Sequence, residues 1–494
     1  MSTPTPHEPQ GPVPTPDGVH DPFAWLEEVD SERALAWVAA RNAETVATLA
    51  ATPAFERTRA AVLEVLDSPA KLPEVSLLGD RLYNFWRDAE HPRGLWRRTT
   101  PEDFRTAEPE WETVLDIDAL NAAEGEDWVW HGASVLRPDV RRALVALSHG
   151  GSDADVTREL DLVTLRFVEE SDGGFVRPAA KGSLGWIDLD TVWLVTDLGP
   201  GTTTTSGYPR TVRRWHRGTP LTAAEVVAEC LESDLAIGAY HDHTPGFERD
   251  LVERAIGFYT QELSVLRPDG SAERVDVPLS ADAGLHRDWL LVQLREDWTP
   301  VEGGPTHRAG ALLAAPWEAY RAGSRDLTVL FEPTPSSSLA SSTWTRHHLV
   351  LTVMQDVTHR VEVLTPPEPA AGGPWARGEL AGVPPLTTVA LRAVDRLVGD
   401  DVWLVTADFT TPPTLAVTTV GSGTPPTGLK AVPPFFDADD VQVSQHFAVS
   451  ADGTRVPYFQ VGRTDGDPAA GPAPTLLYGY GGFEIGRASC RERV

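Results

Sequence analysis

Apolar positions near the start of the chain follow a helical period. Residues 31–50 begin at Ser31, a typical helix cap, and place Leu35 and Val46 in an alanine-rich background. Pro53 suits the first turn of a second helix that follows directly. The pattern therefore predicts two consecutive helices before the chain changes character near residue 70.

From about Leu72 to Pro434 the pattern changes to short apolar runs separated by Gly, Pro, Asp and Asn. Such runs are typical of β-strands joined by turns. One hairpin is readable in full, because Asp269-Gly270 separates two runs in which apolar and polar residues alternate. This long middle part of the chain is predicted to be mainly β.

One strand-like sequence occurs three times within this β-rich part. The segments TVWLVTD (191–197), DWLLVQL (288–294) and DVWLVTAD (401–408) share a Trp-Leu pair that runs into Val. Their tryptophans are 96 and 114 residues apart, which corresponds to roughly two propeller blades of about 40–50 residues each. The spacing predicts a seven-bladed β-propeller, and an array of large β-sandwiches is the alternative.

After Pro434 the pattern shifts again, to two alternating strands joined at Asp452-Gly453. Thr475–Tyr478 is then predicted to be a buried strand, because it is a short apolar run that ends in the glycine-rich turn 479–482. Loops at the carboxyl ends of strands are where α/β enzymes place their reactive groups. We therefore expect the chemistry of this protein beside that turn.

Charge and cysteine content exclude several classes of function. The chain has 42 Lys and Arg against 72 Asp and Glu, and its net charge of -30 argues against nucleic acid and anionic membranes as partners. Two cysteines, Cys230 and Cys490, are too few for a disulfide framework or a cysteine-rich metal centre. No secretory leader and no run of 18 apolar residues is recognisable, so a cytoplasmic location is predicted.

Several segments resemble a known family. DPFAWLE (21–27) resembles its opening segment, 207–210 and 239–244 resemble propeller segments of bacterial members, and YGYGGF (478–483) resembles its most specific turn. The chain is therefore similar to the N-terminal portion of a prolyl oligopeptidase family serine peptidase. The resemblance implies a seven-bladed propeller that is inserted into an α/β-hydrolase domain, caps its active site and admits short peptides.

The resemblance also implies roles for individual residues. Tyr480 matches the tyrosine whose hydroxyl stabilises the oxyanion, and Phe483 matches the phenylalanine that helps to line the proline pocket. The implied reaction is cleavage of short peptides after proline through a Ser/His/Asp triad. It needs no cofactor and no metal, and a monomer is expected.

The resemblance divides the chain into five parts: a flexible arm (1–20), helices of the hydrolase domain (21–71), the propeller (72–435), the incomplete start of the α/β-hydrolase domain (436–485) and a non-native tail (486–494). No Gly-x-Ser-x-Gly nucleophile sequence occurs, and Gly150–Ala154, which lacks the final Gly, is expected to be a turn within a blade. We therefore expect this chain to be a truncated fragment that lacks the triad and is inactive.

Other readings of particular residues remain open from the sequence. His241-Asp242-His243 is expected to be a polar loop at the propeller channel, with a metal site as the alternative. Ser336–Ser338 is expected to be a flexible loop, and the arginines around Trp86 and Trp96 to be part of one hairpin. The alternative functions are a non-catalytic propeller that binds a peptide or protein, and a propeller glycosidase that uses paired carboxylates.

Overall fold

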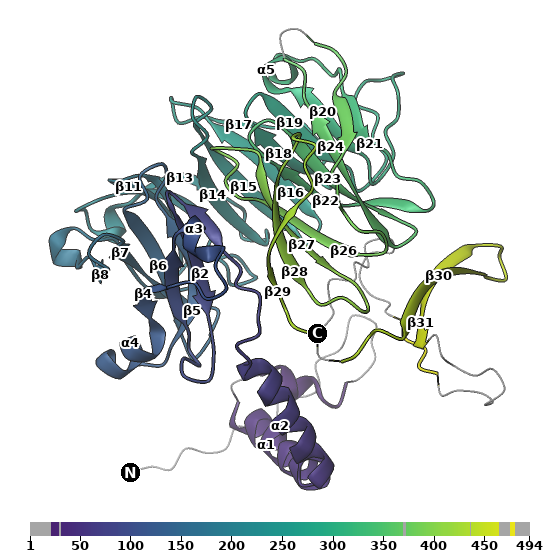
Figure 1. Cartoon of the computed structure of the whole chain (residues 1–494). Coiled ribbons are helices and arrows are strands. Elements are labelled where there is room, and N and C mark those ends of the chain that lie inside the picture. The colour runs from purple at the N-terminus through teal and green to yellow at the C-terminus, as the bar shows by residue number, and fades with distance from the viewer. Residues whose placement is uncertain (1–20, 29–30, 369–371, 435, 464–474, 480–494) are drawn as a thin grey trace, which may run out of the picture. The chain divides into compact units, whose positions relative to one another are not determined.

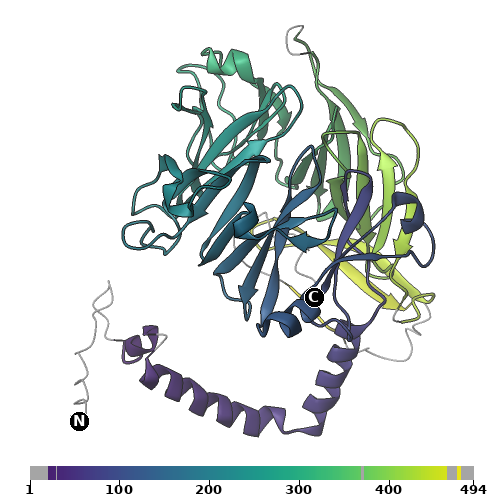
Figure 2. The ribbon, with the colours of Figure 1, turned by 90° about the vertical axis from the view of Figure 1, so that its left-hand side faces the viewer.

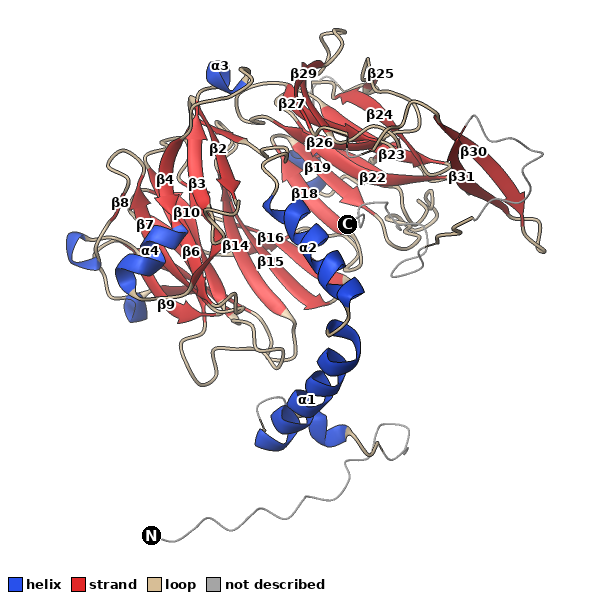
Figure 3. Ribbon diagram, turned by 60° about the horizontal axis from the view of Figure 1, so that its bottom comes forward, coloured by secondary structure: helices blue, strands red, loops and turns tan. Residues whose placement is uncertain are grey.

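A computed structural model describes residues 21–28, 31–368, 372–434, 436–463 and 475–479. The chain divides into two compact units, residues 1–69 and residues 70–494. The first unit is helical and the second consists mainly of antiparallel sheets (Figure 3).

The N-terminal unit contains the two predicted helices. Its elements are η1 (Ala24–Glu27), α1 (Glu32–Thr45), the π-helical turn η2 (Val46–Ala50) and α2 (Pro53–Asp67). The hydroxyl of Ser31 accepts a hydrogen bond from the backbone N–H of Ala34, and Thr52 caps α2 in the same way through Phe55. Most apolar side chains of these helices are exposed, including Leu35 (55%) and Leu66 (62%).

Among its described residues, the second unit contains seven antiparallel sheets of four or five strands, which are the predicted propeller blades, and one two-stranded hairpin (Figure 1). The strands of the first three blades are β1 (Ser76–Leu78), β2 (Arg81–Trp86), β3 (Leu95–Thr99) and β4 (Glu112–Asp116) in blade 1, β5 (Trp128–Val135), β6 (Arg142–His149), β7 (Asp155–Asp161), β8 (Arg166–Phe167) and β9 (Val176–Ala180) in blade 2, and β10 (Gly182–Asp188), β11 (Thr191–Thr196), β12 (Thr211–His216) and β13 (Glu225–Glu229) in blade 3.

The other four blades repeat the four-stranded order. Their strands are β14 (Ala236–Asp242), β15 (Arg249–Gly257), β16 (Thr260–Leu266) and β17 (Ala272–Arg274) in blade 4, β18 (Asp282–His286), β19 (Trp289–Gln293), β20 (Leu312–Pro316) and β21 (Thr328–Phe331) in blade 5, β22 (Ser337–Trp344), β23 (Leu349–Gln355), β24 (Thr358–Thr365) and β25 (Ala376–Glu379) in blade 6, and β26 (Thr388–Ala393), β27 (Asp401–Ala407), β28 (Thr414–Thr419) and β29 (Thr427–Ala431) in blade 7. Short helices occur in the connections: α3 (Pro101–Phe104), α4 (Ile117–Glu124), η3 (Glu170–Asp172), η4 (Leu221–Ala223) and α5 (Trp317–Arg321).

The three similar sequences are equivalent strands. β11, β19 and β27 are each the second strand of their blade, in blades 3, 5 and 7. Their tryptophans are buried, with 1% exposure at Trp193, 6% at Trp289 and 5% at Trp403. The predicted spacing of two blades is confirmed, because these strands belong to blades 3, 5 and 7. The two faces of β11 pack on the two neighbouring blades, so both faces are apolar.

Seven buried apolar clusters hold the ring together, and each one lies between two neighbouring blades. The cluster between blades 7 and 1 contains Val75, Leu82, Phe104, Trp403 and Leu415. Burial of apolar surface between the sheets is therefore the main attraction around the whole ring.

Blades 1 and 7 meet without sharing a strand, because every strand of each blade comes from one continuous stretch of the chain. Side chains join them instead. Phe104 and Trp403 contact edge to face with their ring centroids 6.4 Å apart, and Lys430 donates a hydrogen bond to the carbonyl oxygen of Thr106. In Figure 2 the green strands of blade 7 lie beside the blue strands of blade 1.

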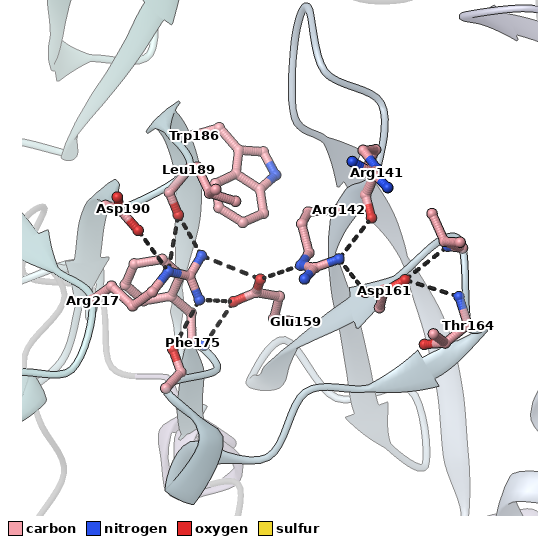
Figure 4. A network of polar contacts seen from close by, with 12 residues as sticks. Arg141, Arg142, Glu159, Asp161, Thr164, Phe175, Trp186, Leu189, Asp190 and Arg217 are labelled. Atoms are coloured by element: carbon pink, nitrogen blue, oxygen red, sulfur yellow. Dashed lines mark hydrogen bonds and ion pairs between the residues drawn. The ribbon is translucent and has the colours of Figure 1, made fainter.

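Blades 2 and 3 are joined by a buried charged network around Glu159 (Figure 4). Glu159 on β7 is fully buried, and its carboxylate accepts hydrogen bonds from the Phe175 N–H at 3.0 Å and from Arg217 at 2.7 and 3.2 Å. Arg142 on β6 forms an ion pair with the same carboxylate at 3.2 Å. Arg217 follows β12 of blade 3 and also donates to the carbonyl oxygen of Leu189 in the β10–β11 turn of that blade. Its bonds to Glu159 therefore connect blade 3 to blade 2.

The segment after the propeller contains a hairpin of β30 (Val441–Val449) and β31 (Arg455–Arg463). Its turn at Asp452-Gly453 is the predicted one. The hairpin contacts the propeller through Gln445, which donates to the carbonyl oxygen of Asp356, and through Phe459, whose ring lies 5.3 Å from that of Phe409.

Two local predictions are wrong. Thr475–Tyr478 is not a buried strand: Leu476 is 91% and Leu477 94% exposed, and no described strand pairs with this segment. An apolar run becomes a strand only where a neighbouring strand supplies hydrogen-bond partners. Ser336–Ser338 is not a free loop either, because Ser337 and Ser338 begin β22 and pair with β23.

Candidate functional site

The innermost strands of the blades together surround the propeller channel. β5 contacts β10, β10 contacts β14, and β22 contacts β26, so the first strands of neighbouring blades are adjacent around the ring. Because all blades share one antiparallel order, these first strands run in the same direction along the channel. Polar residues at the ends of these first strands, or directly after them, therefore gather at one end of the channel. We call this end the channel mouth.

Histidines of blade 4 lie at this mouth. His241 Nδ1 is 2.8 Å from the carboxylate of Asp250 on the neighbouring strand β15, and the rings of His241 and His243 are 4.6 Å apart. The predicted polar loop is corrected here, because His241 and Asp242 belong to strand β14. Burial lowers the pKa of His243. The positive charges of His241 and of Arg137, which is far away in the sequence, also lower it.

Asp242, between the two histidines, is 5% exposed and fully engaged by its neighbours. One of its carboxylate oxygens accepts hydrogen bonds from the backbone N–H of Thr244 at 3.0 Å and from the Thr244 hydroxyl at 2.5 Å. The other lies 3.6 Å from Nε of Arg249. The metal alternative for 241–243 gains no support, because among the described residues these histidines do not belong to any group of three ligand atoms within 4.8 Å of one another.

An ion pair between Arg137 and Asp395 connects blades 2 and 7 at the mouth. Arg137 follows β5 and Asp395 follows β26, and they meet at 2.8 Å although 258 positions separate them in the sequence. Asp395 is 9% exposed, so the pair is largely withdrawn from water. Sequence inspection could not identify this pair, because nothing local marks two residues that are so far apart in the chain.

His286 at the end of β18 has a strongly lowered pKa. Its side chain is 3% exposed and stacks on Trp344 with the ring centroids 4.3 Å apart. Burial lowers the pKa of His286 to about 3, and the positive charges of Arg396, Arg287 and Arg249 contribute in the same direction, while Asp242 opposes them. The ring is therefore neutral at physiological pH.

This burial predicts a pH-dependent stability. A histidine in the unfolded chain has a pKa near 6.5, whereas the pKa of the folded His286 is about 3. In the pH range between these two values, the unfolded chain binds the proton more strongly than the folded chain does. The free energy of unfolding therefore decreases as the pH falls through this range. At pH 5 the loss should be about 2 kcal/mol relative to pH 7. Urea unfolding at both pH values should show this loss in the natural chain and a much smaller one in His286→Gln. The exposed His149→Gln variant is the control, and an unchanged pH dependence in His286→Gln would contradict the assignment.

The described residues contain two other arrangements that resemble functional centres. Glu126, Asp127 and His149 bring their ligand atoms within 4.8 Å of one another, but all three are exposed and belong to the surface of blade 2. Ser444 Oγ lies 2.9 Å from His446 Nε2 on β30, yet no described carboxylate contacts His446 to orient it as a base. Neither arrangement supplies a complete reactive group.

The residues that the sequence analysis assigned to catalysis and substrate binding, Tyr480 and Phe483, lie outside the described residues. Of the turn that contains them, Tyr478 and Gly479 are described, and Tyr478 is 77% exposed. Among the described residues, the channel mouth thus offers charged and hydrogen-bonding groups for a ligand but no nucleophile paired with an oriented base.

Comparison with known proteins places this fold. The family description "Prolyl oligopeptidase, N-terminal beta-propeller domain" matches residues 4–244. This match to the N-terminal β-propeller domain of that family covers slightly less than half of the chain. Relatives of this propeller include an uncharacterized peptidase of Sinorhizobium fredii, 35% identical over 94% of this chain and 64% of that protein, and an uncharacterized peptidase of Rickettsia prowazekii, 25% identical over 93% and 64%.

Solved structures of prolyl oligopeptidase relatives have the same fold. A post-proline cleaving enzyme from Rickettsia typhi superimposes with a TM-score of 0.79 at 22% identity, over 90% of this chain and 65% of that one. Oligopeptidase B from Leishmania major gives 0.64 at 16% identity, over 94% and 63%. The chain spans slightly less than two thirds of the length of these relatives. Among its described residues, no helix combines the length and apolar character needed to span a bilayer.

Proposed function

We propose that this chain is the propeller-bearing part of a serine peptidase that cleaves short peptides after proline. The observation that carries the proposal is the 35% identity to a peptidase over 475 residues, combined with the family match of the propeller. In this proposal the protein is a monomer in the cytoplasm, and the ring admits short peptides to the reactive groups while it excludes folded proteins.

Apolar surface outside the propeller supports the proposal. The helices α1 and α2 expose most of their apolar side chains, and on the hairpin Val449 is 69% and Val456 46% exposed. Patches of this kind are usually covered by another part of a protein. A hydrolase domain that includes these helices and this hairpin would cover them.

Tyr480 and Phe483 have separate roles in the proposed reaction. The Tyr480 hydroxyl donates a hydrogen bond to the carbonyl oxygen as negative charge develops on it, and Phe483 contacts the proline side chain of the substrate. The nucleophile and its base must come from a Gly-x-Ser-x-Gly elbow and its partners. No such elbow occurs in the 494 residues, so we expect the 494-residue chain alone to be inactive.

The test begins with the coding DNA beyond codon 485. The 494-residue chain and any longer product are expressed and assayed with a chromogenic peptide that contains proline and with a fluorophosphonate probe for serine nucleophiles. We expect the longer product to hydrolyse the peptide and to be labelled, and the 494-residue chain to do neither. A natural reading frame that ends at Val494, with a soluble folded product, would refute the peptidase proposal and favour a propeller that only binds peptides.

A further inference from the structure

The turn between β15 and β16 of blade 4 exposes two aromatic side chains. Phe258 is 82% and Tyr259 43% exposed, and their ring centroids lie 4.8 Å apart at an interplanar angle of 80°. Turns of two residues between strands usually consist of Gly, Asn or Asp, which supply the required backbone conformation. Because so little of the Phe258 ring is covered, it contributes almost nothing to the core of its blade.

A neighbouring connection extends this apolar surface. Leu279, between β17 and β18, is 37% exposed, and its carbonyl oxygen accepts a hydrogen bond from the Gln261 N–H at 2.8 Å. Arg295, between β19 and β20 of blade 5, lies over the Tyr259 ring at 5.3 Å from its centroid. We call Phe258, Tyr259 and Leu279 the blade-4 tip. Grouped apolar side chains at a surface usually mark an interaction site.

The blade-4 tip lies at the end of the ring that carries the hairpin. β15, β23 and β27 are each the second strand of their blade, so the turns that follow these strands lie at the same end of the ring. The hairpin contacts the propeller at two of these turns, through Asp356 after β23 and Phe409 after β27. The segment that follows the propeller is therefore seated on the end of the ring where the tip is exposed.

Blade 4 is also the blade farthest from the junction of blades 7 and 1, because three blades separate it from that junction on either side. The chain enters the ring at β1 and leaves it after β29, so both covalent connections of the propeller are at this junction. A part of the protein that is tethered there can swing about the two connections. A contact on the far side of the ring restrains that motion most, since it has the longest lever arm.

We propose that the blade-4 tip is a latch that docks on an apolar surface of the catalytic part of this same protein and holds that part closed over the ring. This inference rests on the proposed function, in which the nucleophile and its base lie outside the 494 residues. The chain spans 64% of each of the two peptidase relatives, so each relative contains a further part. The hairpin begins the approach to this end of the ring, and burial of the Phe258 ring favours closure.

Hydroxyl-radical footprinting tests the docking, because oxidation of a side chain reports its exposure to solvent. The 494-residue chain and the longer product are oxidised in parallel. We expect oxidation of Phe258, now 82% exposed, to fall about 5- to 10-fold in the longer product as its ring is buried. Leu189, 46% exposed in the β10–β11 turn at the other end of the ring, is the control and should be oxidised equally in both. Equal oxidation of Phe258 in both products would overturn the proposal.

The Phe258→Ser variant of the longer product tests whether the contact keeps the protein closed. We compare kcat/KM for a long proline-containing peptide with kcat/KM for the short chromogenic peptide. The ratio should rise about 10- to 100-fold, the change in the open population when burial of one phenylalanine is lost. Leu189→Ser is the control. An unchanged ratio in Phe258→Ser, or an equal rise in Leu189→Ser, would overturn the latch.

A structural defect in the propeller is excluded by the same substitution in the shorter chain. Phe258→Ser should leave the melting temperature of the 494-residue chain unchanged, because the ring is not packed in the propeller. A clear drop in that temperature would show that Phe258 supports its blade and would refute a role confined to docking.

The experiments separate the latch from the peptidase proposal. Footprinting needs no activity, so protection of Phe258 in an inactive longer product would support the docking and refute the peptidase. Peptidase activity without protection would refute the latch alone. A natural reading frame that ends at Val494 would refute both, because the tip would have no further part to hold.

Discussion

Replacing Glu159 by glutamine should lower the free energy of unfolding by about 3–5 kcal/mol, the usual cost of breaking a buried ion pair. The carboxylate is completely buried and is the shared acceptor of Arg142 and Arg217, whose side chains are only 28% and 21% exposed. A neutral amide of the same shape leaves both guanidiniums without their common counter-charge, and it turns an NH₂ group toward one of them. The junction of blades 2 and 3 should then be the weakest part of the ring.

Urea unfolding followed by tryptophan fluorescence measures this effect. The control is Glu229→Gln, which removes an exposed carboxylate that pairs with Arg210. The Glu229 side chain is 53% exposed, so that variant should lose less than about 1 kcal/mol. If Glu159→Gln proved no less stable than Glu229→Gln, the network would not be the support that its burial indicates.

Replacing Tyr480 by phenylalanine in the longer product should lower kcat about 100- to 1000-fold, the usual cost of losing one oxyanion donor. The substitution removes one hydroxyl and keeps the ring, so the pocket that binds the peptide should be largely preserved. Because the hydrogen bond strengthens only as charge develops on the carbonyl oxygen, KM should change little.

Tyr478 in the same turn provides a matched control, since Tyr478→Phe removes the same hydroxyl two residues earlier. Initial rates over a range of peptide concentrations separate kcat from KM for both variants. We expect Tyr478→Phe to retain nearly full kcat. A similar loss in both variants would show that the hydroxyls act through the shape of the turn, and Tyr480 would then not be the oxyanion donor.

The sequence alone determined the class of the fold and the repetition within it. The strand repeats around Trp193, Trp289 and Trp403 were visible because a second strand is buried on both faces and has few acceptable residues. The cap at Ser31 and the helix start at Pro53 were also visible, since a helix start depends on residues only a few positions apart. Each of these features is local, so a linear reading finds it.

Only the tertiary structure decided which charges meet. Arg137 pairs with Asp395, and Glu159 pairs with Arg217, although the partners are distant in the sequence. A groove between blades 7 and 1 is likewise lined by residues from both ends of the propeller, such as Leu72 and Arg392. No local sequence pattern encodes such contacts. Burial also had to come from the structure, because one short apolar run is a core strand at Thr191–Thr196, whereas another is exposed at Thr475–Tyr478. Charge pairing and burial depend on the structure for the same physical reason. Hydrogen-bond partners and low-dielectric surroundings are supplied by neighbouring residues that only the folded ring brings together.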